Sequence, residues 1–383
     1  MNPLVSLTFL LTLLVCGGQV LAAESGPEYQ PVPADALSVP QTLLSLIHTP
    51  QVQAELGLTG PKLASFLPVL RKLDGPWWMA RIRPRPEQRE ITAKLEQQLV
   101  AELEDKCGAA AIRRLRQLEL QSQGPRMLAR PDLKQYLQLS ASQSDQLTQL
   151  FADTDALVTK VNTPEGQKNA ELIAELQKTA GAEPERAKGI LSPEQQRRLQ
   201  FAMGALIDTS KFERIYPLAP ELIDSGEWVG SSRTRLSNLR GKIVLVHFYA
   251  FQCSNCRANF HIYNRWHRTL RDKGVAVIGI QTPETSAESD AAVVRAAAIK
   301  DGFEFPVVID LKHENWTAWA NTMWPTVYVI DQDGYVRFWW QGELNWQGAT
   351  VDRTIETLVE RLLAEASPPI GTPAVSATRT GNP

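Results

Sequence analysis

Two cysteines three positions apart, Cys253 and Cys256, have the type and spacing that thiol chemistry requires. The residues before them, KIVLVHFYAF (242–251), are apolar and rich in β-branched side chains, which predicts a strand buried on both faces. The residues after them predict a helix that ends at Gly274. We therefore expect Cys253 at a helix N-terminus, where free N–H groups and the helix dipole favour a thiolate. Cys256, one turn further on, could then resolve a mixed disulfide, and Arg257 adds a cation nearby.

Other uses of this cysteine pair fit the sequence less well. A c-type haem site needs His after the second cysteine, where this chain has Arg257. A zinc site needs two more ligands, and His261 and His267 follow on the same predicted helix without zinc-finger spacing. The residues VHFYAFQ before Cys253 contain neither the proline nor the threonine or serine that a peroxiredoxin needs. A structural disulfide stays open as an alternative, although the loop it closes is too short to constrain much of the chain.

The elements that must position the pair alternate between strands and helices from about residue 226. The predicted strands after the first are VAVIGIQTP (275–283), FPVVID (305–310), TVYVID (326–331) and YVRFWWQG (335–342). The helices between and after them are predicted over 290–302, 314–321 and 351–365. Strands that alternate with crossover helices predict an α/β fold around a central mixed sheet, and the turn DQDG predicts an antiparallel hairpin at one side.

These segments resemble a known family. KIVLVHFYAFQCSNCRANFHIYNRWH, GVAVIGIQTPE, FPVVID and WPTVYVIDQDGYV resemble, in order, the envelope thioredoxin-like thiol–disulfide oxidoreductases of the TlpA/ResA and DipZ C-terminal-domain kind. The resemblance implies a thioredoxin-like domain over 220–365 that uses Cys253 and Cys256 without an organic cofactor or metal. It also implies that Pro325 follows a cis peptide bond and lies against the dithiol, where the neighbouring backbone receives the substrate peptide. Trp324 then shapes the substrate surface, unless it simply belongs to the core.

Two positions depart from the pattern of that family. His247, six residues before the first cysteine, stands where thioredoxins often have a buried acid. It could take the proton from Cys256 during resolution, or it could be a hydrogen-bonded core histidine, and the sequence leaves both readings open. Asn259 stands where some ResA-like proteins have an acid three residues after the second cysteine. The group that handles protons is therefore not identified by the resemblance.

The region before the sheet, 40–215, is predicted to be an all-α domain. Apolar and charged residues alternate at helical spacing, as in ITAKLEQQLVAELEDK (91–106) and AAAIRRLRQLELQ (109–121). Residues 49–67 resemble residues 130–150 at a shift of about 81, and a second pair of segments matches at a shift of about 84, which predicts an internal duplication.

A short motif recurs inside this helical region. It reads LSASQ at 139–143 and LSPEQ at 191–195, and in each the serine is expected to cap a helix, with Pro193 in the first turn. The motif resembles the LTxxQ segments of small helical envelope proteins such as Spy and CpxP. Helix caps in an ordinary bundle are the alternative explanation.

Both ends of the chain have their own composition. Residues 1–22 contain an apolar run followed by small residues at Val20-Leu21-Ala22, which predicts a cleaved export signal, with an uncleaved membrane anchor as the alternative. Cys16 would be discarded with that signal, which leaves Cys107 as an odd thiol. The tail 366–383 has little to bury and is predicted to be disordered.

Composition excludes one class of partner. With 40 Lys+Arg against 42 Asp+Glu, the net charge of −2 argues against a nucleic-acid binder that works through bulk electrostatics. Together these features predict an exported, periplasmic or envelope thiol–disulfide oxidoreductase. Its expected partners are a disulfide- or thiol-bearing protein substrate, a membrane or envelope redox partner, and a protein partner for the helical domain. The alternative is a scaffolding or binding protein whose thioredoxin-like domain carries an inert disulfide.

Overall fold

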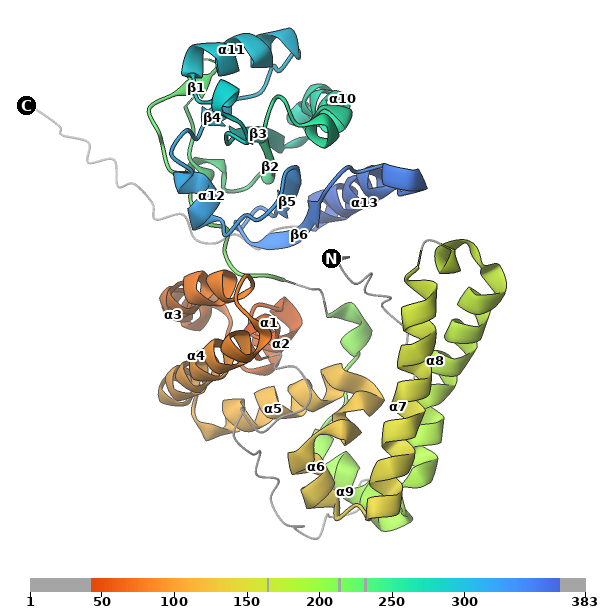
Figure 1. The fold of residues 1–383 in the computed structure, drawn as a ribbon. Helices are drawn as coiled ribbons and strands as arrows, with labels where there is room; N and C mark the ends of the chain where they lie inside the picture. Colours follow the sequence, from red (N-terminus) through yellow and green to blue (C-terminus); the bar gives the residue numbers. More distant parts are fainter. Residues whose placement is uncertain (1–42, 164, 213–214, 231–232, 366–383) are drawn as a thin grey trace, which may run out of the picture. The chain divides into compact units, whose positions relative to one another are not determined.

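The computed structural model describes residues 43–365 apart from 164, 213–214 and 231–232 (Figure 1). The predicted signal at 1–22, with Cys16, and the predicted tail at 366–383 lie outside the described residues. The described chain packs as two compact units. We call residues 43–73 and 83–215 the helical unit, and residues 74–82 and 216–365 the sheet unit. Across the part of the chain that is described, no helix is long and apolar enough to span a membrane.

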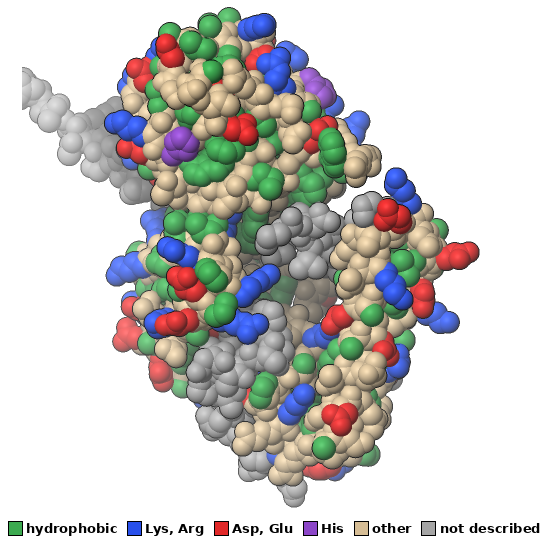
Figure 2. All heavy atoms as spheres, viewed as in Figure 1, with side chains coloured by type: hydrophobic (Ala, Val, Ile, Leu, Met, Phe, Trp, Pro, Cys, Tyr) green, Lys and Arg blue, Asp and Glu red, His purple; other side chains and the backbone are tan. Residues whose placement is uncertain are grey.

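The first part of the chain is helical, as predicted. Its α-helices are α1 (Leu43–Leu46), α2 (Pro50–Glu55), α3 (Gly60–Ala80), α4 (Arg85–Cys107), α5 (Ala109–Gln123), α6 (Pro131–Leu137), α7 (Ala141–Val161), α8 (Ala170–Ile190) and α9 (Pro193–Met203). The boundary between the units falls inside α3, because residues 74–82 pack with the sheet unit. That segment lies within the range expected for the all-α domain. On the face shown in Figure 2, basic and acidic side chains are interspersed over α7 and α8.

The two serine motifs form the helix caps that the sequence predicts. Ser140 and Gln143 make a capping box at the start of α7, and Ser192 and Gln195 make another at the start of α9. The two glutamine side chains also bond each other, since Gln143 Nε2 lies 2.8 Å from Gln195 Oε1. The recurring motif therefore ties the beginnings of two helices together.

The order of elements in this region repeats. The helices α2, α3 and α5 begin at residues 50, 60 and 109, and α6, α7 and α9 begin at residues 131, 141 and 193. The short first helix ends in the same way each time. Gly57 has φ 67° and Gln138 has φ 54°, and the next N–H bonds back across the turn, from Leu58 to Gln53 O and from Leu139 to Lys134 O. This recurrence is what a duplication would leave, and the duplication stays a prediction.

The sheet unit is built on six strands in the order β1-β4-β3-β2-β5-β6. The central strand β2 pairs in parallel with β3 and antiparallel with β5, so the sheet is mixed, as predicted. The strands are β1 (Trp228–Val229), β2 (Ile243–Tyr249), β3 (Val275–Gln281), β4 (Val307–Ile309), β5 (Thr326–Ile330) and β6 (Val336–Gln341). The helices are α10 (Ser254–Leu270), α11 (Ala291–Lys300), α12 (Glu314–Ala318) and α13 (Val351–Ala364).

Side chains of β2 alternate between two hydrophobic clusters, one on each face of the sheet. Leu245 belongs to the cluster beneath α10, α11 and α13, which also contains Cys256. Val246 belongs to the cluster on the opposite face, where Trp319 after α12 and Trp78 of the 74–82 segment are buried. Every residue of β2 is buried, which explains its continuous apolar run. Both parts of the predicted fold class, an α/β sheet domain after a helical region, are confirmed.

Candidate active site

The cysteine pair lies after the end of β2, at the start of α10. Cys253 is the N-cap residue of α10, and its Sγ accepts a hydrogen bond from the Cys256 N–H at 3.3 Å. The two sulfurs are joined as a disulfide, with the Cα atoms 5.2 Å apart. Cys253 is partly exposed, whereas Cys256 is only 1% exposed. Another molecule can therefore reach the first sulfur and not the second.

Arg257 follows the pair on the exposed side of α10. Its Nη1 lies 3.4 Å from the Phe251 carbonyl oxygen and 3.7 Å from Asp301 Oδ1 at the end of α11. The guanidinium thus has an acidic partner of its own, which offsets part of the positive charge that it brings to the site.

The loop before β5 contains the cis peptide bond that the resemblance implies, and the position of Pro325 against the dithiol stays a prediction. The Trp324–Pro325 peptide bond is cis. The Pro325 carbonyl oxygen accepts a hydrogen bond from Gly342 N–H at 2.8 Å, which anchors the loop to the end of β6. Trp324 is partly exposed and its ring lies 4.0 Å from that of Trp316. Trp324 and Cys253 pack against the same hydrophobic cluster, so the tryptophan contributes to the core while its remaining surface is open to another molecule.

His247 lies in an aromatic box under α10. Its ring stacks on Tyr263 at 4.0 Å and on Tyr249 at 5.2 Å, with Phe303 and Phe305 at its edges. It is fully buried, and neither ring nitrogen has a hydrogen-bond partner among the described residues. Burial lowers its pKa to about 3, which makes it a poor proton acceptor. Of the two readings left open, these surroundings favour a core histidine, although one without the expected hydrogen bond.

Asn259 serves as a structural tie. It is buried one turn after Cys256, its Oδ1 accepts from Leu344 N–H at 2.9 Å, and its Nδ2 lies 3.4 Å from Gly342 O. The same Gly342 is bonded to Pro325. The amide therefore connects α10 to the loop that supports the cis proline, a task for which a neutral side chain suffices.

One buried carboxylate near the pair was not predicted. Glu288 is fully buried in the loop between β3 and α11, and its Oε1 accepts from Gln252 N–H at 2.8 Å. Its Oε2 accepts from the N–H groups of Glu284 and Thr285, at 2.7 and 3.1 Å. Glu288 thus fixes the residue immediately before Cys253. The bonded N–H groups belong to loops without a sequence signature, and only the Thr285–Glu288 capping box could have pointed to this residue.

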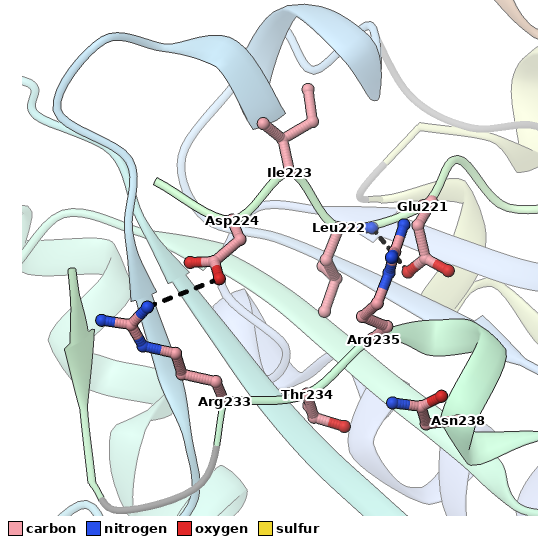
Figure 3. A pocket seen from close by; sticks show the side chains of 8 residues that line it. All are labelled: Glu221, Leu222, Ile223, Asp224, Arg233, Thr234, Arg235 and Asn238. Atoms are coloured by element: carbon pink, nitrogen blue, oxygen red, sulfur yellow. Dashed lines mark hydrogen bonds and ion pairs between the residues drawn. The ribbon is translucent and has the colours of Figure 1, made fainter. Parts of the chain in front are cut away.

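Cys107, the third cysteine of the described residues, belongs to the helical unit. Cys107 is a free, partly exposed thiol that ends α4. Within the described ranges, no three His, Cys, Asp or Glu side chains group as metal ligands would. A pocket of about 590 Å³ opens on the sheet unit between residues 221–224 and 233–238 (Figure 3). There Arg233 faces Asp224 at 3.7 Å, and none of the predicted site residues lines the pocket.

A comparison with protein families matches this part of the chain. Residues 225–339 match the model described as the AhpC/TSA family. The matched residues lie within the sheet unit. Their place in the chain agrees with the resemblance read from the sequence.

The curated proteins similar to this chain include one that is named as a thiol-disulfide oxidoreductase. DipZ of Mycobacterium bovis is 37% identical over 166 residues, a match that covers 42% of this chain and 23% of DipZ. The chain thus spans less than a quarter of that relative. The thiol-disulfide oxidoreductase YkuV of Bacillus subtilis is 25% identical over 146 residues, which cover 38% of this chain and 94% of YkuV. A solved thiol-disulfide isomerase of Corynebacterium glutamicum is similar at 23% identity with a TM-score of 0.35, covering 39% of this chain and 97% of that one.

Proposed function

We propose that this protein is a thiol–disulfide oxidoreductase in which Cys253 exchanges disulfides and Cys256 resolves them. The observation that carries the proposal is the asymmetry of the pair. The reachable sulfur caps a helix that favours its thiolate, and the buried sulfur lies one turn behind it. The similarity of the chain to YkuV, which is named as a thiol-disulfide oxidoreductase, supports the same chemistry.

The exchange balances in two steps. The Cys253 thiolate attacks one sulfur of a substrate disulfide, and the other substrate sulfur leaves as a thiolate that takes up a proton. Cys256, as a thiolate, then attacks the Cys253 sulfur and releases the second substrate thiol. Two electrons and two protons pass from the dithiol to the substrate, and the Cys253–Cys256 disulfide remains. The same steps in reverse oxidise a substrate dithiol.

The loop around the cis proline is the proposed substrate surface. Met323 is 44% exposed and Trp324 is partly exposed, so two apolar side chains border the site before Pro325. A segment of a disulfide-bearing protein, in an extended conformation, fits such a surface through its backbone and its apolar side chains.

We propose that the protein works outside the cytoplasm. This follows from the predicted export signal at 1–22, with a membrane anchor as the alternative. A membrane or envelope redox partner would return the pair to its starting state. The helical unit would bind a protein partner of its own.

The test compares single cysteine variants in reduction of insulin by dithiothreitol. Cys253→Ser should abolish catalysis, and Cys256→Ala should accumulate mixed disulfides on Cys253. Cys107→Ser is the matched control and should retain full activity, because Cys107 belongs to the helical unit. Full activity of Cys253→Ser would refute the proposal. A pair with a reduction potential below about −300 mV and slow exchange would support the scaffolding alternative.

A further inference from the structure

The sheet unit is completed by a segment from far away in the sequence. Residues 74–82, the end of α3 and the turn after it, belong to this unit. Trp78 is 2% exposed and lies in the hydrophobic cluster on the face opposite α10. Its ring is 5.8 Å from that of Tyr328 on β5, and its Nε1 donates to the Trp319 carbonyl oxygen at 2.9 Å. The tryptophan therefore anchors the segment on the sheet.

Arg81 makes the polar contacts of this segment. Its guanidinium lies 3.9 Å from the centre of the Trp78 ring. Its Nη2 donates to the Ala320 carbonyl oxygen at 2.8 Å and to the Tyr328 hydroxyl at 3.2 Å, and it also donates to the Trp319 carbonyl oxygen. Ala320 has φ 47°, a conformation that costs energy for a residue with a Cβ. A charged donor on its carbonyl oxygen helps to hold that conformation.

The contacts of Arg81 continue to the loop before the cis proline. The Tyr328 hydroxyl, which accepts from Arg81, donates to Asn321 Oδ1 at 2.9 Å. Asn321 is 4% exposed, and its Nδ2 donates to the Met323 carbonyl oxygen at 3.1 Å. That carbonyl oxygen also accepts from Thr326 Oγ1 at 2.7 Å. One chain of hydrogen bonds thus runs from Arg81 to the residue immediately before Trp324.

We propose that Arg81 is a positioning residue for the substrate loop, residues 321–325. It sets the conformation at Ala320 and orients the Tyr328 hydroxyl, and Asn321 passes this order to the Met323 carbonyl. The end of α3 and the turn after it thereby help to hold Trp324 and Pro325 in the conformation that a substrate meets. That residues 321–325 receive a substrate rests on the proposed function, whereas the dependence of their conformation on Arg81 does not.

The test replaces Arg81 and Tyr328 separately, since these are the first two residues in the series of hydrogen bonds. Arg81→Ala removes the donor, and Arg81→Lys keeps the positive charge but lacks the planar guanidinium with its several N–H donors. Tyr328→Phe deletes only the hydroxyl that links Arg81 to Asn321. Arg83→Ala is the matched control, since Arg83 is exposed and its ion pair with Glu87 lies within the helical unit. Because Tyr328→Phe retains the ring, this variant should fold even if Arg81→Ala does not.

The first readout is insulin reduction. Arg81→Ala and Tyr328→Phe should each raise KM about tenfold, the effect of losing the charge-assisted hydrogen bond from Arg81 to the Tyr328 hydroxyl that both variants lack, with little change in kcat. Arg81→Lys should lie between Arg81→Ala and the unaltered protein. Alkylation of reduced Cys253 by iodoacetamide should be unchanged, because the nucleophile lies on α10 and not on the loop. The double variant should be no worse than Arg81→Ala, since both changes break the same chain.

The second readout does not depend on activity. Hydrogen exchange of peptides that cover 318–328 should become about tenfold faster in Arg81→Ala and Tyr328→Phe, with 253–260 and the Arg83→Ala control unchanged. An unchanged KM and unchanged exchange in 318–328 would overturn the proposal. If the unaltered protein fails to reduce insulin, the proposed function fails, and hydrogen exchange still decides whether Arg81 orders the loop.

Discussion

His247 is fully buried on β2, with its ring close to the backbone of β3. An added Cβ at Gly279 would lie 3.2 Å from His247 Nε2, a tight contact, so the glycine leaves room for the ring against the backbone of β3. Four aromatic rings also surround it, those of Tyr249, Tyr263, Phe303 and Phe305. The surroundings exclude water and offer the ring nitrogens no partner among the described residues. The imidazole is therefore held neutral inside the core.

The pKa of His247 leads to a prediction about pH. The unfolded chain binds a proton near pH 6.5, and the folded chain binds it only near pH 3. The free energy of unfolding should therefore lose up to about 1.4 kcal/mol per unit as the pH falls from 6.5 towards 3, and should not vary through this group above 6.5. His247→Phe should remove this loss, and urea denaturation at several pH values measures it.

The same variant distinguishes the two readings of His247. A core histidine predicts that His247→Phe keeps kcat/KM for insulin within about threefold at pH 7, because the ring touches no reacting atom. A proton acceptor for Cys256 predicts slow resolution, with mixed disulfides accumulating on Cys253. Accumulation of that kind would contradict the core reading.

Among the elements, the loop between β3 and α11 and the residues before α10 are fastened to each other. Glu288 binds three backbone N–H groups from these two segments, and Thr285 Oγ1 donates to Gln252 Oε1 at 2.8 Å. A fully buried carboxylate that satisfies several donors is costly to replace. The position of the N-terminus of α10, which Cys253 caps, therefore depends on the loop that follows β3.

We predict that Glu288→Gln lowers the free energy of unfolding by about 1.5–3 kcal/mol, because an amide cannot accept from all three donors. It should also speed hydrogen exchange at Gln252. Glu284→Gln is the control, since that side chain is exposed and only its backbone N–H takes part. Equal stability of the two variants in urea denaturation would show that the carboxylate does not fasten the loops.

For the molecule as a whole, the helical unit contains a buried acid that should make its stability depend on pH. Glu96 on α4 is 1% exposed and accepts from the Leu43 N–H at 2.9 Å. Burial, and then the nearby Glu119, raise its pKa to about 8. The folded chain thus holds a proton that the unfolded chain releases near pH 4.5. The free energy of unfolding should fall through this group as the pH rises from 4.5 to 8.

Glu96→Gln should abolish that fall, because the amide stays neutral and keeps an oxygen for the Leu43 N–H. The expected difference from the unaltered protein is near zero at pH 5 and in favour of the variant, by more than about 1 kcal/mol, at pH 8. Thermal unfolding followed by far-UV circular dichroism measures this difference. A variant that is equally destabilised at both pH values would show that Glu96 is charged in the fold.

The parts of this molecule that were predictable are those with a local signature. Local sequence patterns alone predicted Cys253 at a helix N-terminus, from the apolar run 242–251 and the helix after Cys256. The cis bond before Pro325, in contrast, followed only from the resemblance to a known family. Trp78 and Arg81 were missed because helical periodicity continues through α3 and says nothing about what its last turn packs against. One signal was present: eight of the ten tryptophans follow residue 226, and the other two are Trp77 and Trp78.

The membership of residues 74–82 in the sheet unit also determines when that unit can be finished during synthesis. The segment leaves the ribosome before residues 83–215, and its binding face exists only once β5 and the turn after α12 have been made. Until then Trp78 has no partner for its indole N–H, and the sheet has an open apolar face. A C-terminal fragment that starts at residue 216 would keep that face open permanently. The sheet unit is therefore not one contiguous piece of the sequence, and a fragment meant to contain all of it would also need residues 74–82, the end of α3 and the turn after it.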